Sequence, residues 1–322
     1  MNTPGRDTFW DTTKAVLMWL VILGHAIQVL TPDAFFSHPL FKAIYLFHLP
    51  LFFYISGYFA FSSITTKKWK SLGKTAMRLL FPVLTFGTLE ALLIYTQKAI
   101  SVQDFLSCYV CLWFLWSLFE CQVFGHILIS IPHGTWKALV LALPIAISLF
   151  FPNSIPYADY LCFSWPFFAI GLYARHRRFT SDSFNARWLW CLIPAAVLLY
   201  FFDDGWYIYL APLKLTAESA FIACYRIIAA IFAGATFLAI MRYISVKLNL
   251  EKSGASTLGI YIVQAVICTT ASKFSYPAIY SELWVIIPVS LLVYCISYYT
   301  YLLTRKVPLA GLLFYGDVGK RK

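Results

Sequence analysis

Long apolar runs alternate with short polar segments along the whole chain, and many of the runs are long enough to cross a membrane. A helix rises about 1.5 Å per residue, so about 20 apolar residues cross the roughly 30 Å hydrocarbon layer. The pattern predicts an all-α polytopic membrane protein, with one membrane-embedded domain over residues 1–322 and a bundle of about ten transmembrane helices. The expected segments are approximately 15–31, 44–64, 79–97, 108–131, 138–151, 160–174, 187–202, 218–241, 256–272 and 283–303.

The fifth and sixth of these segments are the least regular. Both are short, and Pro152, Pro156 and Pro166 interrupt the region. An eleven-helix or re-entrant arrangement therefore stays open there, because irregular backbone at membrane depth is tolerated where protein buries it.

Composition supports the membrane class and excludes an ordinary soluble domain. Hydrophobic residues make up 61% of the 322 positions and charged residues 12%, and the mean hydropathy is +0.73. Soluble domains have about 45–50% apolar and about 25% charged residues. The aromatic share of 19% is typical of interfacial Trp and Tyr belts.

Basic residues concentrate on one predicted side, as the positive-inside rule requires of cytoplasmic segments. With about ten spans and the N-terminus inside, the cytoplasmic segments contain Arg6, Lys14, Lys67, Lys68, Lys70, Lys74, Arg78, Lys137, Arg175, Arg177, Arg178, Arg187, Arg242, Lys247, Lys252, Arg305, Lys306, Lys320, Arg321 and Lys322. The opposite side has Lys42, Lys98, Lys214, Arg226 and Lys273. We therefore expect both termini in the cytoplasm, in a bacterial inner (cytoplasmic) membrane, and topology explains the net charge of +11 without a nucleic-acid partner.

The eight cysteines do not indicate a metal site. Cys108 and Cys111 have the spacing of a redox or zinc pair, but no second pair or histidine cluster in the sequence completes such a site. We expect them to pack at a helix start, and cysteines inside apolar runs to act as small hydrophobes.

The first apolar segment has the clearest polar face. Asp11, Lys14, His25 and Gln28 follow one another at helical spacings. Lys14 and His25 are eleven residues apart, which at about 100° per residue is three turns plus roughly 20°, so they share a face about 16 Å apart. Histidine exchanges protons near neutral pH. This suits a polar channel in which Lys14 lies at the cytoplasmic entrance and His25 acts as a base near the middle of the bilayer. A snorkelling Lys14 and a His25 hydrogen-bonded within the bundle remain the structural alternative.

Other apolar segments also contain polar residues. His48 precedes Pro50, and the pair Ser56 and Gly57 permits close helix approach. Trp113, Ser117 and Glu120 share a face of the fourth segment, and Glu120 is expected either to pair structurally or to contact a substrate.

Three more features have both a structural and a functional interpretation. Arg226, several residues inside the eighth segment, is expected to bind an anion or to snorkel outward. The stripe of Thr257, Tyr261 and Gln264 favours helix packing. The basic clusters at 67–78 and 175–178 are membrane anchors by default, and they would also attract an anionic cytosolic ligand.

Motifs in these segments together resemble a known family. The matching stretches are 11–14 with 21–25, 47–59, 78–82, 112–115, 168–171 and 256–264. Taken together they resemble the integral-membrane acyltransferase type three family, especially its fucose-acetyltransferase-like branch. Lys14 stands where many members have Arg, and Gln264 stands where the motif often ends in His, so Gln264 is given no acid–base role.

The resemblance implies transfer of an acyl group, commonly acetyl, from cytosolic acyl-CoA to a hydroxyl of a sugar or cell-envelope glycan. It implies an O-acetyltransferase that uses no metal, whose partners are membrane lipids, acyl-CoA and a sugar or glycolipid acceptor. The implied catalytic residues are His25 as the base, Lys14 and Asp11. The implied contacts to CoA are Lys14, Lys74 and Arg78, and those to the acceptor are His48, Trp113 and Glu120.

A second class of function stays open. A proton-coupled transporter or flippase of a polar lipid or small solute would use His25 and Glu120 as a proton relay. A single cation aligned with His25 at the cytoplasmic entrance favours an anionic cofactor over a gradient-coupled path. Binding of acyl-CoA distinguishes the two classes.

The predicted topology has a direct test. Cysteines placed in segment 67–78 should react with a membrane-impermeant thiol reagent only from the cytoplasmic side, since this segment is among the most basic of the chain. Labelling of the same positions from outside intact cells would contradict the assignment.

Overall fold

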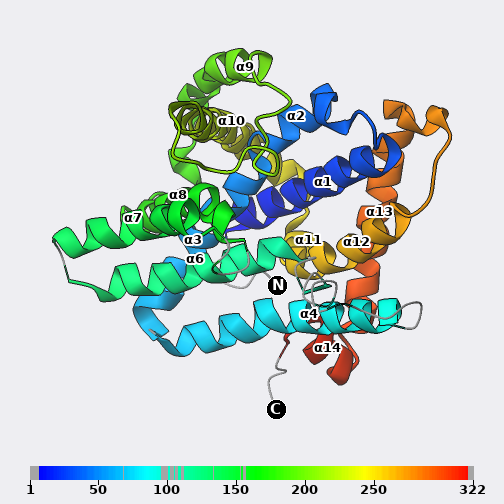
Figure 1. The fold of residues 1–322 in the computed structure, drawn as a ribbon, viewed down its shortest axis with the longest axis horizontal. Helices are drawn as coiled ribbons and strands as arrows, with labels where there is room; N and C mark the ends of the chain where they lie inside the picture. Colours follow the sequence, from blue (N-terminus) through cyan, green and yellow to red (C-terminus); the bar gives the residue numbers. More distant parts are fainter. Residues whose placement is uncertain are drawn as a thin grey trace. The chain divides into compact units, whose positions relative to one another are not determined.

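The computed structural model describes residues 7–67, 69–95, 112–132, 134–152 and 157–317, with the single positions 101, 105, 108, 109 and 154. Over these residues the regular secondary structure is entirely helical (Figure 1). Several residues used in the predictions lie outside this set: Arg6, Lys68, Lys98, Cys111, Pro156, Lys320, Arg321 and Lys322.

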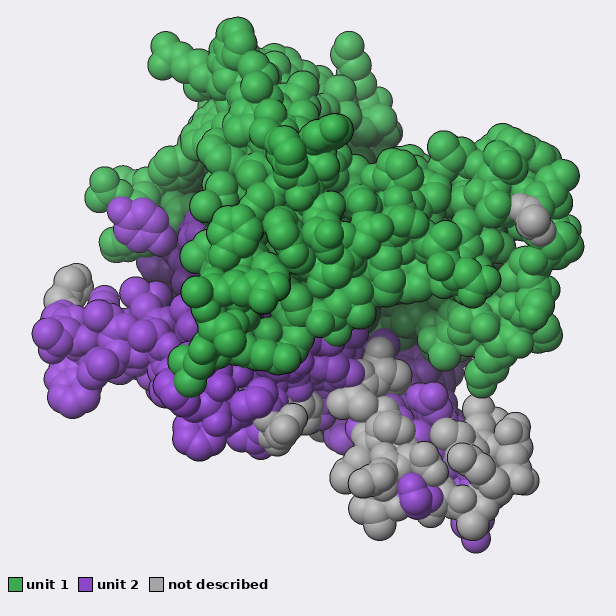
Figure 2. All heavy atoms as spheres, turned by 45° about the horizontal axis from the view of Figure 1, so that its top comes forward, with its two compact units in different colours: residues 1–55, 174–301 green, residues 56–173, 302–322 purple. Residues whose placement is uncertain are grey.

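The chain forms two compact units, which Figure 2 distinguishes by colour. Unit 1 contains residues 1–55 and 174–301, and unit 2 contains residues 56–173 and 302–322. The single-domain organisation stays a prediction.

Unit 1 is built around α1 (Thr8–Leu30), which packs against α2, α10, α11 and α12 (Figure 1). The other helices of the unit, some of which continue past its boundary, are α2 (Pro39–Tyr45), α3 (His48–Lys67), α9 (Leu192–Tyr200), α10 (Ala217–Leu248), α11 (Glu251–Gly254), α12 (Thr257–Ala271) and α13 (Leu283–Thr304). A buried cluster that includes Ile27, Phe41, Tyr207 and Ala229 joins α1 to α2, α10 and the loop before α10.

The ends of α1 follow from its sequence. Asp7 caps the helix, because its carboxylate accepts a hydrogen bond from the Phe9 backbone N–H at 3.0 Å. Asp11 in the first turn complements the positive end of the helix dipole. At the other end, the Thr31 hydroxyl donates to the Ile27 carbonyl at 2.6 Å, and Pro32 follows.

Unit 2 contains α4 (Trp69–Tyr95), α6 (Trp113–Ser130), α7 (Thr135–Phe150) and α14 (Pro308–Tyr315), with most of α3 and of α8 (Leu161–His176). α4 packs against α6 and α14, and α6 packs against α7. α3 and α8 come into backbone contact, since a Cβ atom added to Gly57 would lie 2.0 Å from the Phe168 carbonyl oxygen. The close approach expected of Ser56 and Gly57 is thus confirmed, and its partner is α8.

Each of the predicted apolar segments overlaps a helix, so the all-α prediction is confirmed over the described residues. Five helices in this part of the chain are long and apolar enough to cross a membrane: Thr8–Leu30, Pro39–Lys67, Trp69–Leu92, Ala217–Leu248 and Leu283–Thr304. Thr135–Phe150, Ala186–Tyr200 and Thr257–Ala271 are apolar but shorter. The count of about ten spans and the cytoplasmic termini stay predictions.

Two boundaries differ from the predicted ones. Segment 69–78, expected as a polar connection, forms the first turns of α4, because Lys, Leu, Ala and Arg are good helix formers whatever their hydropathy. The second predicted segment breaks after Tyr45 into α2 and α3, just before Pro50, whose missing N–H removes a helical hydrogen bond. At this break the His48 ring lies 2.8 Å from the Ile44 carbonyl oxygen through Nδ1.

A glycine-to-alanine substitution at the α3–α8 contact should destabilise unit 2. Gly57→Ala forces the helices apart, and overpacking of this kind costs roughly 1–3 kcal/mol. Gly73→Ala is the matched control: Gly73 is also helical, and an added Cβ meets nothing within 4 Å. Thermal unfolding in detergent should show a lower midpoint for Gly57→Ala only; equal midpoints for the two variants would contradict the contact.

Candidate functional site

The polar residues predicted on α1 form two pairs within the helix. Lys14 Nζ lies 2.7 Å from Asp11 Oδ1, and the Asp11 side chain is nearly buried while that of Lys14 is 21% exposed. His25 Nδ1 lies 2.7 Å from Gln28 Oε1. Because each pair spans a three-residue step, both can form on the helix surface without another element.

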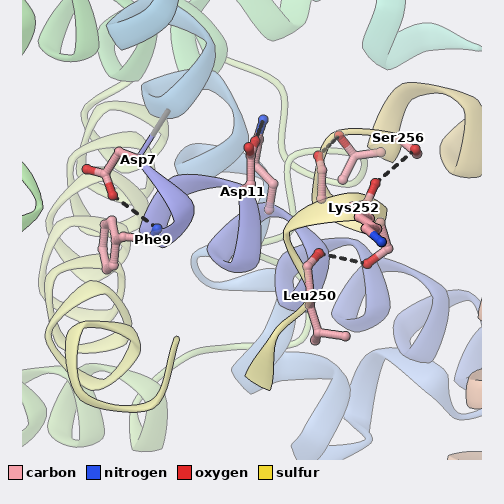
Figure 3. A network of polar contacts seen from close by, with 10 residues as sticks. Asp7, Phe9, Asp11, Leu250, Lys252 and Ser256 are labelled. Atoms are coloured by element: carbon pink, nitrogen blue, oxygen red, sulfur yellow. Dashed lines mark hydrogen bonds and ion pairs between the residues drawn. The ribbon is translucent and has the colours of Figure 1, made fainter. Parts of the chain in front are cut away.

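A second element covers the start of α1. A Cβ atom added to Gly254 of α11 would lie 1.7 Å from the Asp11 carbonyl oxygen, so only glycine allows this approach. The covering segment is held by its own side chains: the Ser253 hydroxyl donates to the Leu250 carbonyl and the Ser256 hydroxyl to the Lys252 carbonyl. Figure 3 shows this segment beside the first turns of α1. The short helix α11 was not predicted from the sequence. Gly254 was the one residue there that indicated a close approach of two backbones.

The His25 ring is half-buried and has a defined orientation. Gln28 Oε1 can only accept hydrogen bonds, so its partner Nδ1 carries the proton. The Tyr45 hydroxyl also donates to this oxygen, at 3.4 Å. Nε2 is then the ring nitrogen with a lone pair, which is the form a general base needs.

Gly24 makes room for the tyrosine in this group. A Cβ atom at position 24 would lie 2.7 Å from a ring carbon of Tyr45. The Tyr45 ring also meets the His48 ring edge to face, with centroids 4.5 Å apart. Tyr45 therefore contacts both the amide that orients His25 and the second predicted histidine.

His48 itself is 2% exposed, and its Nδ1 is bonded to the Ile44 carbonyl. It lies close enough to His25 for the two rings to interact electrostatically. Its predicted contact with an acceptor stays a prediction.

Buried polar side chains continue in the rest of unit 1. Gln264 is fully buried in α12, where the Cys268 thiol donates to its Oε1 at 3.6 Å. Arg226 is 5% exposed in α10, and its Nη1 donates to the Trp206 carbonyl at 3.4 Å. The Arg226 side chain is thus buried and bonded within the protein rather than snorkelling outward.

In unit 2 the predicted CoA contacts lie on one helix. Lys74 and Arg78 are exposed on α4, four residues apart and so on one face. The residue that ends α14, Gly316, packs against the backbone of α4 beside Arg78. Gly316 has φ +57, and a Cβ atom added to it would lie 2.2 Å from the Met77 carbonyl oxygen. The position of the Arg78 backbone thus depends on a glycine in the left-handed region at the end of α14.

A histidine that the sequence reasoning missed anchors the same segment. His126 is 1% exposed near the end of α6, and its Nε2 lies 3.0 Å from the Ser71 hydroxyl. Its Nδ1 donates to the Gln122 carbonyl at 2.7 Å, so Nε2 accepts from Ser71. This bond joins the start of α4 to α6. The sequence indicated it only by placing a polar residue, His126, near the end of an apolar run.

The predicted acceptor residues of unit 2 share the other end of α6. Trp113 is half-buried at the first position of the helix, and Glu120 is 7% exposed two turns later. The structure therefore groups the predicted residues into Asp11, Lys14, His25 and His48 in unit 1, and Lys74, Arg78, Trp113 and Glu120 in unit 2. In the described part of the chain, no three His, Cys, Asp or Glu side chains are grouped to hold a metal ion.

Long apolar helices whose few polar side chains are bonded within the protein are features of an integral membrane protein. The sequence pattern of the acyltransferase domain family matches residues 7–302, so the chain belongs to the integral-membrane acyltransferase type three family that its motifs resemble. This match spans every predicted site residue and most of both units.

Two curated relatives have a narrower similarity. Nodulation protein NolL of Mesorhizobium japonicum is 31% identical over 185 residues, which are 53% of this chain and 48% of that protein. Nodulation protein NolL of Sinorhizobium fredii is 32% identical over 177 residues, 52% of this chain and 48% of that protein. The chain thus spans about half the length of the curated relatives it matches. No solved structure matches the chain.

The pairing of His25 with Gln28 generates a prediction about acyl transfer. Gln28→Leu removes the acceptor that fixes Nδ1–H and should lower turnover roughly tenfold, the usual scale for a side chain that orients an imidazole. Gln28→Glu keeps an acceptor oxygen and should retain turnover. Turnover is measured as acyl transfer to a sugar acceptor, and a Gln28→Leu protein with unchanged turnover would show that the bond is not needed.

Proposed function

We propose that the protein transfers an acyl group, commonly acetyl, from cytosolic acyl-CoA to a sugar hydroxyl, with His25 as the general base. The observation that carries the proposal is the His25–Gln28 pair, which leaves Nε2 able to accept a proton, in a chain of the acyltransferase family. A hydroxyl is a weak nucleophile until a base takes its proton, so such a transfer requires a group of this kind.

The proposed reaction is a single displacement. The sugar hydroxyl gives its proton to Nε2 of His25 as its oxygen attacks the thioester carbonyl. The carbon–oxygen bond forms and the carbon–sulfur bond breaks. The proton then passes from the imidazolium to the departing CoA thiolate, so His25 ends as it began.

The donor is assigned to acyl-CoA because of the cations in the predicted cytoplasmic segments. Lys74 and Arg78 are exposed on one face of α4, where they can meet phosphate groups. Lys14 is partly exposed, and its ion pair with Asp11 holds the ammonium in place at the start of α1. In the proposal Lys14 and Asp11 orient the CoA end of the donor.

In the proposal the acceptor is a carbohydrate of the cell envelope, and the protein lies in the bacterial inner membrane. The support is the resemblance of the motifs to the fucose-acetyltransferase-like branch.

The His25 substitutions test this function. His25→Ala should lower acyl transfer by roughly 10²–10⁴-fold, as the loss of a general base does. His25→Gln should not restore it, because an amide does not take up a proton at neutral pH. Mass spectrometry should detect acylated glycans in cells that make the wild type and none in cells that make His25→Gln.

Binding of acetyl-CoA to the purified proteins supplies the control. Wild type and both variants should bind it equally, and added salt should weaken binding because exposed charges are screened. A folded His25→Gln protein with near-normal transfer would end the catalytic assignment. A wild type that does not bind acetyl-CoA would favour the transporter class instead.

A further inference from the structure

Three aromatic rings meet near the start of α6, in unit 2. The Trp113 ring centroid lies 5.0 Å from that of Tyr160 and 6.0 Å from that of Tyr157, and the two tyrosine centroids lie 5.3 Å apart. Tyr157 directly precedes and Tyr160 ends a short 3₁₀ turn, Ala158–Tyr160, before α8. All three side chains are half-buried, so each keeps an accessible part.

Two carboxyl groups accompany the rings. Glu120 is 7% exposed, and its Oε2 has no hydrogen-bond partner among the described residues. Asp159 of the 3₁₀ turn is close enough for the two carboxyl groups to interact electrostatically. Burial also raises the pKa of Asp159 above its ordinary value.

This arrangement is unfavourable for packing alone. A buried carboxyl oxygen without a hydrogen-bond partner is unfavourable, and a second carboxyl group nearby adds to this. The Ser117 hydroxyl, one turn before Glu120 on the same helix face, is also fully buried without a partner in the described structure. Groups of this kind are satisfied when a ligand brings hydrogen-bond donors.

The turn that carries the two tyrosines is held in a strained conformation. Tyr157 has φ 60 and ψ 25, the left-handed region that a bulky residue rarely adopts. The Ser148 hydroxyl of α7 donates to the Ala158 carbonyl at 2.6 Å and accepts from the Cys162 backbone N–H at 2.8 Å. Strain that the surrounding structure fixes in this way clusters at ligand sites.

We propose that the cluster of Trp113, Tyr157, Tyr160, Glu120 and Asp159 binds a sugar ring of the acceptor. This inference rests on the proposed function and names the residues that select its acceptor. The ring faces pack against the C–H groups of the sugar, and the carboxyl oxygens accept from its hydroxyls.

The charge of the cluster argues for the acceptor rather than the donor. None of the five residues of the cluster is a cation that could pair with a CoA phosphate. The cations assigned to the donor lie on α4, whose start is bonded to His126 through Ser71. Trp113 and His126 are thirteen residues apart on α6, which is about 20 Å along the helix. The aromatic rings of the cluster and the segment that carries the donor cations of unit 2 therefore lie toward different ends of α6, with Glu120 between them.

The test measures binding of simple sugars to the full-length protein in detergent by saturation-transfer NMR. The probes are the methyl glycosides of a neutral hexose, a 6-deoxyhexose and an N-acetylhexosamine, with tetramethylammonium as a cationic probe. Tyr157→Ala and Tyr160→Ala remove rings from the cluster, and Glu120→Gln replaces the carboxyl group by an amide of nearly the same shape. Tyr173→Ala is the matched control, since Tyr173 is 61% exposed farther along α8.

At least one glycoside should bind the wild type and the Tyr173→Ala protein equally. Its affinity should fall about tenfold or more in each of the other three variants, as truncation of a central binding residue does. The inference is overturned if no glycoside binds the wild type, if the cluster variants bind as well as the control, or if tetramethylammonium displaces the sugar.

Acetyl-CoA binding is measured on the same samples and should be equal in all of them. If the wild type does not bind acetyl-CoA, the proposed function is wrong. The glycoside titrations test the sugar site independently of that result. The two failures are thus distinguishable.

Discussion

The hydrocarbon layer offers no hydrogen-bond partners, and this constraint shapes the whole polar part of the molecule. Every polar side chain inside the helices must find its partner within the protein or in a ligand. On α1 the side chains pair with each other: Asp11 with Lys14, and His25 with Gln28. The second pair both satisfies the imidazole and fixes which nitrogen carries the proton, so the requirement for stability also prepares the proposed base.

Glycines bring other segments against the helix that carries these pairs. Gly24 admits the Tyr45 ring, whose hydroxyl reaches the oxygen that orients His25. Gly254 lets α11 pack on the backbone of Asp11. In a membrane, close packing of small residues replaces the hydrophobic driving force between helices. A larger side chain at position 24 would displace the Tyr45 ring, and one at position 254 would displace the backbone of Asp11.

Sequence periodicity was sufficient for contacts within one helix and insufficient for contacts between segments. Spacing alone placed Lys14 and His25 on one face and matched the apolar segments to helices. It did not find the bond between Ser71 and His126, because their positions are 55 residues apart and each looks unremarkable in its own segment. It likewise placed Trp113 and Glu120 on one face but missed the tyrosines of the 3₁₀ turn, which the fold brings beside them.

The central claim is that Gln28 holds His25 with its proton on Nδ1 and a lone pair on Nε2. ¹⁵N NMR of histidine-labelled protein tests it, with the His25 signals assigned by their loss in His25→Gln from among the six histidines. At pH 8, above the ordinary histidine pKa of about 6.5, the account predicts a protonated Nδ1 and an unprotonated Nε2. A His25 ring protonated on Nε2 instead would contradict it.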